Sequence, residues 1–299
     1  PYVCPRRYMD ALDERGFRVP KKPNYRADLS SKPLSHRIWA KRFESVTYDE
    51  LDRAQKGLFA CNEFCDYEIG RVLDKVEELG LEPMIIYTAD HGDMLLSHGI
   101  AGKGCAMYEE ITNIPLIISV KGQTLPGSDV PVSHLDLLPT LMKYLDVKIP
   151  KPLQGKALQD IKDENRYIFL EYTRYETDHD GFMGYQPIRC VTDGRYKLVI
   201  NLLDTDELYD LGADPYEKEN LIHCEKYKEI RNELHDILIA QMDDTRDNSR
   251  GYQWLCRPWR EGAEPSFDNS GMTRQAVEED YVQLDYSTGL PMKDPVRKK

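Results

Sequence analysis

The chain has 299 residues, of which 40% are hydrophobic and 31% are charged, and its formal net charge is −12. This length can bury a sizeable core in one or two domains. The acidic balance argues against a nucleic-acid-binding surface, and no apolar run approaches the roughly 18 residues of a membrane-spanning helix. Neither nucleic acid nor a membrane is therefore expected as a partner, and an anionic small substrate would need a local positive site.

The first long helix is predicted to follow an irregular start. Residues 1–41 are rich in Pro and Arg and show little periodicity. Thr47 and Glu50 then fit a capping box, and apolar or small residues recur at steps of three and four up to Gly80. Gly80 fits the left-handed residue that ends a helix.

Two apolar runs, at residues 83–88 and 114–120, are predicted strands. Continuous apolar runs of this kind are typical of a parallel sheet that is covered on both faces. Residues 133–146 predict a further helix with Pro139 near its first turn. The alternation of helices and strands indicates an α/β fold, in which this region is part of a large mixed sheet flanked by helices.

A smaller α+β subdomain is predicted after about residue 151. Short strands are expected at residues 167–172, 188–192, 196–201 and 207–211. An amphipathic helix is expected at residues 225–243, so the subdomain combines a short antiparallel sheet with one long helix. The predicted boundaries are 1–155 for the α/β part, 156–245 for the subdomain and 246–299 for an irregular tail wrapped on the surface.

The seven cysteines show no spacing of a disulfide framework. Cys61 and Cys65 lie four residues apart on the predicted helix, where a bridge between them is geometrically poor. We interpret the cysteines as free thiols, which favours a reducing cytoplasmic compartment. The chain begins without Met or a signal peptide, so the periplasm stays open as well and the localisation is unknown.

Residues 87–104 read YTADHGDMLLSHGIAGKG and place many polar groups directly after a predicted strand. Asp90 and His91 fall at its carboxyl end, where function gathers in α/β sheets. A carboxylate beside an imidazole can hold a divalent cation, with further ligands from elsewhere. Lys103, between two glycines, could place a point charge on a tetrahedral anion held by that metal. The alternatives are a turn with a solvated His and a solvated loop Lys.

These residues resemble the second conserved block of the sulfatase family, of the alkaline-phosphatase-like superfamily. The matching pieces are YTADHGD at 87–93, SHG at 97–99, KG at 103–104, YEE at 108–110, IPLII at 114–118, SHLDLLPTL at 133–141, RYKL at 195–198, DELYDL at 206–211, DP at 214–215 and ENL at 219–221. Residues 250–260 and 285–291 are most similar to a bacterial, YidJ-like branch. The resemblance covers nearly the whole chain.

The resemblance assigns roles to individual residues. It implies that Asp90 and His91 are two ligands of the active-site cation, usually Ca²⁺ with Mn²⁺ or Mg²⁺ as other options. It implies that Lys103 binds a sulfate oxygen and stabilises charge on the transferring group. His98 is a candidate pocket-lining catalytic residue, with a loop-packing histidine as the alternative. Apart from the resemblance, the stretch EYTRYE at 171–176 is expected at a strand end, and its Arg174 is a candidate substrate contact, with a solvated rim as the alternative.

One departure from the family concerns the nucleophile. Sulfatases attack with a formylglycine made from a Cys or Ser in a C-x-P-x-R motif, and two further metal-binding Asp lie earlier still. Nothing before Asp90 fits, because Cys4-Pro5-Arg6-Arg7 has the wrong order. We therefore expect the formylglycine outside this chain, in an N-terminal half of the same gene product. The literal match at 256–260 lies after the subdomain and has the bulky Trp259 where the family favours a small residue, so we interpret it as a decoy.

The resemblance implies a sulfuric ester hydrolase that acts on a small sulfated substrate, such as an aryl sulfate or a sulfated sugar. In the family mechanism a formylglycine hydrate attacks sulfur while the cation, the Lys and nearby His stabilise charge and protonate the leaving group. The alternatives are a phosphodiesterase or phosphonate monoester hydrolase of the same superfamily, and a catalytically incomplete piece that only completes a sheet or docks a partner. We expect this chain alone to be inactive.

Other polar residues have simpler interpretations. The remaining histidines singled out are expected on the surface or on a helix face, and three aspartates lack a calcium-loop pattern and are expected in turns. The histidines are His179, His223 and His235, and the aspartates are Asp204, Asp206 and Asp210.

Overall fold

The computed structural model describes residues 2–262, apart from residues 122, 125–126, 128, 163–164 and 175–184. The chain divides into two units, Pro1–Arg250 and Gly251–Lys299. The described part of the second unit contains the short helix α7 (Tyr252–Leu255), which lies in the region expected to be an irregular tail. The segment 285–291 and His179 lie outside the described residues.

The first 41 residues contain two helices, so the expectation of an irregular start is wrong. These helices are α1 (Arg6–Glu14) and α2 (Leu34–Lys41). Helices this short are marginal by themselves and depend on tertiary contacts. The backbone N–H groups of Leu34 and Ser35 donate to the Asp204 carboxylate at 2.8 and 3.0 Å. The N-terminal cap of α2 therefore comes from a residue about 170 positions away.

The helix α3 (Tyr48–Glu78) confirms the prediction made from its capping box. The Glu50 N–H donates to the Thr47 side chain, and the Thr47 N–H donates back to the Glu50 carboxylate. Gly80 follows the helix with a φ of +62°, the left-handed conformation expected of it. Apolar residues on the C-terminal half of α3, Ile69, Val72, Leu73 and Leu79, are exposed.

The two predicted apolar strands exist, but their expected parallel pairing is wrong. β1 (Met84–Thr88), β2 (Leu116–Val120) and β3 (Gln123–Thr124) form an antiparallel sheet in the order β1-β2-β3. Thr88 pairs with Leu116, so β2 begins where β1 ends. The chain between them, which contains the one-turn helix α4 (Glu109–Thr112), returns to the end of the sheet at which β1 finishes and does not cross back to its start, as parallel pairing would require.

One face of this first sheet is open in the described structure. Tyr87 and Ile117 pair across the strands, and their exposed fractions are 47% and 50%. The expectation that the sheet is covered on both faces therefore does not hold for the described residues.

The predicted helix after the first sheet is confirmed as a 3-10 turn, η1 (His134–Asp136), followed by α5 (Leu137–Tyr144). Ser133 caps it, and the buried Asp136 carboxylate accepts from the Ser133 N–H at 2.8 Å. The Arg166 guanidinium donates to the same carboxylate at 2.6 Å. This buried ion pair connects η1 to the start of the C-terminal subdomain.

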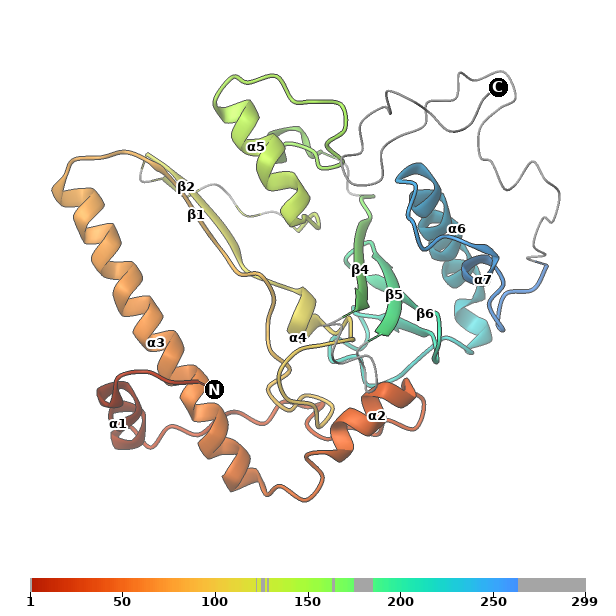
Figure 1. Cartoon of the computed structure of the whole chain (residues 1–299), viewed down its shortest axis with the longest axis horizontal. Coiled ribbons are helices and arrows are strands. Elements are labelled where there is room, and N and C mark those ends of the chain that lie inside the picture. Colours follow the sequence, from red (N-terminus) through yellow and green to blue (C-terminus); the bar gives the residue numbers. More distant parts are fainter. Residues whose placement is uncertain are drawn as a thin grey trace, which may run out of the picture. The chain divides into compact units, whose positions relative to one another are not determined.

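The second sheet and its helix confirm the predicted α+β subdomain. β4 (Ile168–Arg174), β5 (Tyr185–Thr192), β6 (Tyr196–Asn201) and β7 (Glu207–Asp210) are antiparallel in chain order. After the 3-10 turn η4 (Glu225–Tyr227), α6 (Lys228–Asp244) packs against β5 and β6 (Figure 1). His235 lies on α6 but is buried, whereas His223 is exposed as expected.

Residues 105–111 join the N-terminal helices to the second sheet. Met107 and Cys105 pack with Ile188, Cys190 and Val199 of the subdomain. A neighbouring cluster contains Trp39, Met94, Ile100, Ala106, Tyr108, Ile111 and Tyr209. The chain that follows Asp90 and His91 is thereby fastened to a well-packed core. Among the described helices, none has the length and apolar character needed to span a bilayer.

Candidate metal and anion site

The Asp90–His91 pair follows the carboxyl end of β1, which is the outer strand of the described first sheet. The two side chains lie side by side, with Asp90 Oδ2 and His91 Nε2 3.2 Å apart. Their side chains are 83% and 34% exposed, respectively. The pair therefore presents its polar atoms to solvent instead of burying them in the core.

The hydrogen bonds of this pair determine the His91 tautomer. A carbonyl oxygen only accepts, so the contact of 2.9 Å between His91 Nδ1 and the Gly92 carbonyl requires the proton on Nδ1. Nε2 is then the ring nitrogen that faces the Asp90 carboxylate and the one left for a metal. A carbonyl partner on the far nitrogen is the usual arrangement of a metal-binding histidine.

The spacing of the two donor atoms fits a divalent cation. Two neighbouring ligands at a right angle, each about 2.3 Å from an ion, lie roughly 3.3 Å apart, close to the observed 3.2 Å. Within the described ranges no group of three or more His, Cys, Asp or Glu residues is arranged to hold a metal. Asp90 and His91 could thus supply two ligands to such an ion, and the described residues add no third.

Lys103 is exposed and acts electrostatically on the pair. The pKa of the Asp90 carboxyl lies below its ordinary value, mainly because the His91 backbone N–H donates to it, with smaller contributions from the charges of His91 and Lys103. A Cβ added at Gly104 would lie 3.0 Å from the Trp39 ring, so glycine permits the close packing beside Lys103. Asp90 and His91 are in contact, and Lys103 is near enough to Asp90 for its charge to act on that carboxyl.

A closely bonded loop leads from the pair to Lys103. Asp93 Oδ1 accepts from the N–H groups of Leu95 and Gly102 at 2.9 and 3.3 Å, and Oδ2 accepts from the Tyr2 hydroxyl at 2.6 Å. Leu95, Leu96 and His98 have φ angles of 45°, 69° and 56°, a conformation that non-glycine residues adopt only when their surroundings hold them there. Asp93 therefore closes the loop at both ends, and Lys103 follows directly.

His98 lies inside the protein, where the pocket-lining role expected for it does not fit. Its exposed fraction is 0%, and its ring stacks on Tyr108 with centroids 4.2 Å apart. The Asn24 amide donates to Nε2 at 3.3 Å, and the His98 N–H donates to the Asn24 carbonyl at 2.7 Å. Burial, followed by the charge of Lys32, lowers the pKa of His98 to about 3. These contacts agree with the loop-packing alternative.

A buried ionic cluster beneath the loop was not predicted. Lys197 Nζ contacts Glu217 Oε1 at 2.9 Å and Glu109 Oε1 at 2.5 Å, and it donates to the Met107 carbonyl at 2.9 Å. Glu217 Oε2 accepts from the Glu109 N–H at 2.7 Å. Burial raises the pKa of Glu217 to about 7, although Lys197 opposes the shift. The signal in the sequence was a lysine within the otherwise apolar strand YKLVI.

Arg174 lies at the end of β4 and is exposed. Its guanidinium lies over the Tyr185 ring, 5.9 Å from the centroid. The adjoining residues 175–176, which were expected to share the rim, are outside the described residues. Cys256, in the literal C-x-P-x-R match, follows α7 in the second unit and is partly exposed.

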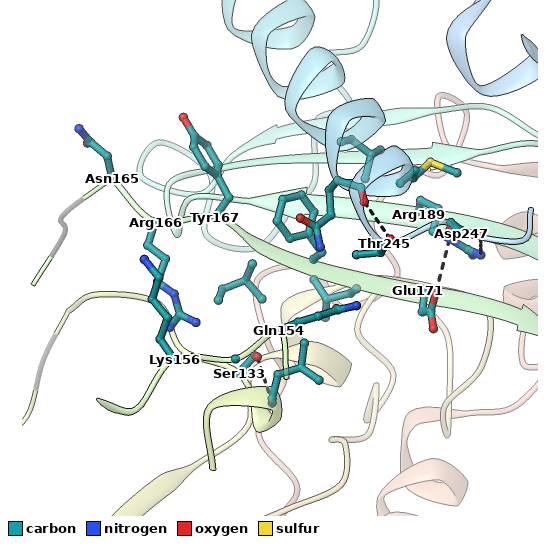
Figure 2. A pocket seen from close by; sticks show the side chains of 18 of the residues that line it. Ser133, Gln154, Lys156, Asn165, Arg166, Tyr167, Glu171, Arg189, Thr245 and Asp247 are labelled. Atoms are coloured by element: carbon teal, nitrogen blue, oxygen red, sulfur yellow. Dashed lines mark hydrogen bonds and ion pairs between the residues drawn. The ribbon is translucent and has the colours of Figure 1, made fainter. Parts of the chain in front are cut away.

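A cavity of about 690 Å³ lies between η1, β4 and the end of α6 (Figure 2). Figure 2 shows Glu171 and Asp247 beside Arg189, whose guanidinium contacts the Asp247 carboxylate at 2.6 Å. None of the predicted site residues lines this cavity. The turn η1 forms part of the cavity wall and also contacts the end of β1, where the Thr88 hydroxyl lies 3.2 Å from His134 Nε2.

Comparisons with known proteins point to one family. The family model described as "Sulfatase" matches residues 37–147, and the model described as "N-sulphoglucosamine sulphohydrolase, C-terminal" matches residues 97–244. The uncharacterized sulfatase YidJ of Escherichia coli (strain K12) is 40% identical over 294 residues, which cover 97% of this chain and 58% of YidJ. The chain thus spans little more than half the length of this relative.

Two solved structures share the fold. A phosphonate monoester hydrolase from Silicibacter pomeroyi matches with a TM-score of 0.68 and 21% identity, covering 86% of this chain and 56% of that one. BT4656, solved in complex with its substrate D-glucosamine-2-N,6-O-disulfate, matches with a TM-score of 0.65 and 20% identity, covering 83% and 64%. Together with the family models and the similarity to YidJ, this shows an alkaline-phosphatase-like fold. The chain belongs to the sulfatase family.

Proposed function

We propose that this chain is the part of a sulfate-ester hydrolase that supplies two ligands of the active-site cation and the lysine that binds sulfate. The observation that carries the proposal is the 3.2 Å approach of Asp90 Oδ2 and His91 Nε2, on the solvent side of β1 and within the influence of Lys103. The similarity to sulfatases over most of the chain supports the same reaction class.

Each residue has a distinct task in this proposal. Asp90 and His91 hold the cation, for which the family suggests Ca²⁺, and the cation when bound polarises a sulfate oxygen. Lys103 places its ammonium against the charge that develops on the transferring group. Asp93 keeps the loop closed so that Lys103 stays beside the pair. The nucleophile, a formylglycine in this family, is expected outside this chain.

We propose a sulfated sugar as the substrate class. One support is the family model that matches residues 97–244, whose name refers to an enzyme that hydrolyses N-sulfated glucosamine. The other is the BT4656 structure, which was solved with a disulfated glucosamine bound. Arg174 is the proposed additional contact with the sugar or its sulfate, because it is an exposed cation at the end of β4.

The open face of the first sheet is evidence for a further polypeptide segment that covers it and completes the enzyme. Tyr87 and Ile117 are about half exposed, and the apolar residues on the C-terminal half of α3 are exposed as well. Exposed apolar patches of this kind mark interaction surfaces. We propose that polypeptide corresponding to the N-terminal half of a sulfatase covers this face and brings the remaining ligands and the nucleophile.

The test compares this chain alone with a complete protein that includes an N-terminal sulfatase half. Hydrolysis of glucosamine 6-sulfate, glucosamine N-sulfate and 4-nitrophenyl sulfate is measured with and without added Ca²⁺. We expect turnover only from the complete protein, and loss of that turnover in Asp90→Ala and His91→Ala. Asp160→Ala, a similarly exposed carboxylate outside the site, is the control. Full activity of both site variants would refute the metal assignment.

A phosphonate monoester hydrolase is the second candidate, favoured by the structural match with a TM-score of 0.68. Both reactions need a cation and a lysine on a tetrahedral anion. Assaying phenyl phosphonate esters beside the sulfate esters separates them. A higher kcat/KM on the phosphonate than on every sulfate ester would replace the first proposal with the second.

A further inference from the structure

The N-terminal residues 2–8 lie along one face of α3. A Cβ added at Gly57 would be 3.4 Å from the Tyr2 Cβ, so Tyr2 lies against that turn of the helix. Further along, the Tyr8 ring packs on Phe64 with centroids 5.3 Å apart. The N-terminal segment and the helix therefore run beside one another between these two contacts.

Cys4 and Cys61 lie between the two contacts on their respective segments. Positions 57, 61 and 64 of an α-helix share one face, because they are four and three residues apart. Cys4 lies between Tyr2 and Tyr8 in the same way. The flanking contacts place the two thiols near one another, and Cys4 is close enough to Cys61 to act on its ionisation. Burial, followed by the neighbouring Cys4, raises the pKa of the Cys61 thiol.

Cys65, the third thiol of this region, is less well placed to form a disulfide with Cys61. Cys65 lies one turn after Cys61 and is exposed, whereas Cys4 and Cys61 are partly buried. Two cysteines four apart on one helix point along the same face, and the geometry of a bridge between them is poor. Cys4, which comes from a different segment, does not have this restriction.

We propose that Cys4 and Cys61 are a disulfide-forming pair, whose sulfurs join when the protein meets a small-molecule disulfide such as oxidised glutathione. One thiolate of the pair attacks the oxidant, forms a mixed disulfide and releases one glutathione. The second thiolate attacks the protein sulfur of that mixed disulfide and releases the other glutathione. The two protein thiols lose two electrons and two protons, and one glutathione disulfide becomes two glutathione thiols.

The bond would secure the segment that supports the candidate site. Tyr2 is two residues from Cys4, and its hydroxyl donates to Asp93 Oδ2 at 2.6 Å. Asp93 in turn closes the loop that leads to Lys103. A cross-link at Cys4 would hold Tyr2 against Asp93. The bond itself does not depend on the proposed sulfatase function, so it can be tested on this chain without substrate.

The experiment treats the purified chain with oxidised glutathione, traps free thiols with an alkylating reagent and maps the peptides without reduction. We expect two of the seven thiols to disappear, with a peptide that joins Cys4 to Cys61. Cys65→Ser should form the same cross-link, and Cys4→Ser and Cys61→Ser should each lose it. Circular dichroism of each variant shows whether it is folded, and Cys4→Ser provides the test if Cys61→Ser does not fold.

Several outcomes would overturn the proposal. Glutathione adducts without a cross-linked peptide would show that the two sulfurs cannot reach bonding geometry. A Cys61–Cys65 peptide, or a disulfide-linked dimer on a non-reducing gel, would show that other pairs react first. Retention of all seven thiols under conditions that oxidise a control dithiol peptide would show that the pair is not reactive.

Discussion

The two sheets of the first unit differ in how completely they are covered. In β5, β6 and β7 most residues are buried, including Cys190, Leu198 and Leu208, whereas in the outer strand β4 only Ile168 is buried. In β1 and β2 only Ile118 is buried, and Tyr87 and Ile117 are about half exposed. The second sheet has its own core within this chain, whereas the first sheet still presents an apolar face. The candidate site follows the strand with the open face, which agrees with a site completed by another segment.

The largest stability effect is expected in the buried ionic cluster of the second sheet. Lys197→Met would leave the Glu217 and Glu109 carboxylates without their common cation, and Lys197 and Glu217 have exposed fractions of 0%. Breaking one partner out of a buried pair costs about 3–5 kcal/mol of unfolding free energy. Urea unfolding measures this, with the exposed Lys148→Met as control. A loss below about 0.5 kcal/mol, the range of surface substitutions, would contradict the assignment.

A matched pair of truncations compares the two sheets directly. Leu198→Ala removes a fully buried side chain of β6, and we expect a loss of about 2–5 kcal/mol. Ile117→Ala removes a half-exposed side chain of β2, and we expect a change within about 0.5 kcal/mol. Urea unfolding of this chain measures both changes in unfolding free energy. Equal losses would show that the face around Ile117 is already covered.

At the candidate site the expected effect is on activity and not on stability. Lys103→Ala should lower kcat/KM of the complete enzyme by about a hundredfold or more, because one donor to a developing anion contributes about 3 kcal/mol. Its melting temperature should stay nearly unchanged, since Lys103 is exposed. Lys103→Arg should restore activity only in part. Lys151→Ala, in another exposed turn, is the control. A collapsed melt for Lys103→Ala would make the residue structural instead.

The smallest effect, a pH dependence, tests the packing between the site loop and the core. The pKa of His98 is about 3 in the folded protein and 6.5 in the unfolded chain. Between these values the unfolded chain binds the extra proton, so the unfolding free energy falls as the pH drops below 6.5. The decrease is at most about 1.4 kcal/mol per pH unit for this group.

Lys32, His36, Glu110 and Asp214 act on His98 and remain in place in His98→Gln. We therefore compare urea unfolding of the two proteins at pH 7.5 and pH 5. The wild type should lose more unfolding free energy than the variant over this interval. Identical pH profiles would show that folding does not change the pKa of His98, as expected for a solvated imidazole.

Local patterns predicted those elements whose signals lie within a few residues. The capping box at Thr47 and Glu50 marks the start of α3, and Gly80 marks its end. The four strands of the second sheet alternate with turn residues, and α6 has helical periodicity. The sequence also picked out Asp90, His91 and Lys103 as candidates, because they follow an apolar strand closely. Asp90 and His91 are in contact, and the roles of the three residues stay predictions.

The sequence by itself thus determined most of the secondary structure between α3 and α6, the subdomain's composition and the candidate polar residues, since these depend on neighbours within a turn or a strand. Tertiary structure decided the rest. α2 exists because the distant Asp204 caps it, and β2 is antiparallel because its chain stays at the end of β1. His98 is buried because Tyr108 and Asn24 enclose it. Lys197 is buried because two carboxylates from separate segments, Glu109 and Glu217, meet it inside the fold, and periodicity carries no information about such long-range partners.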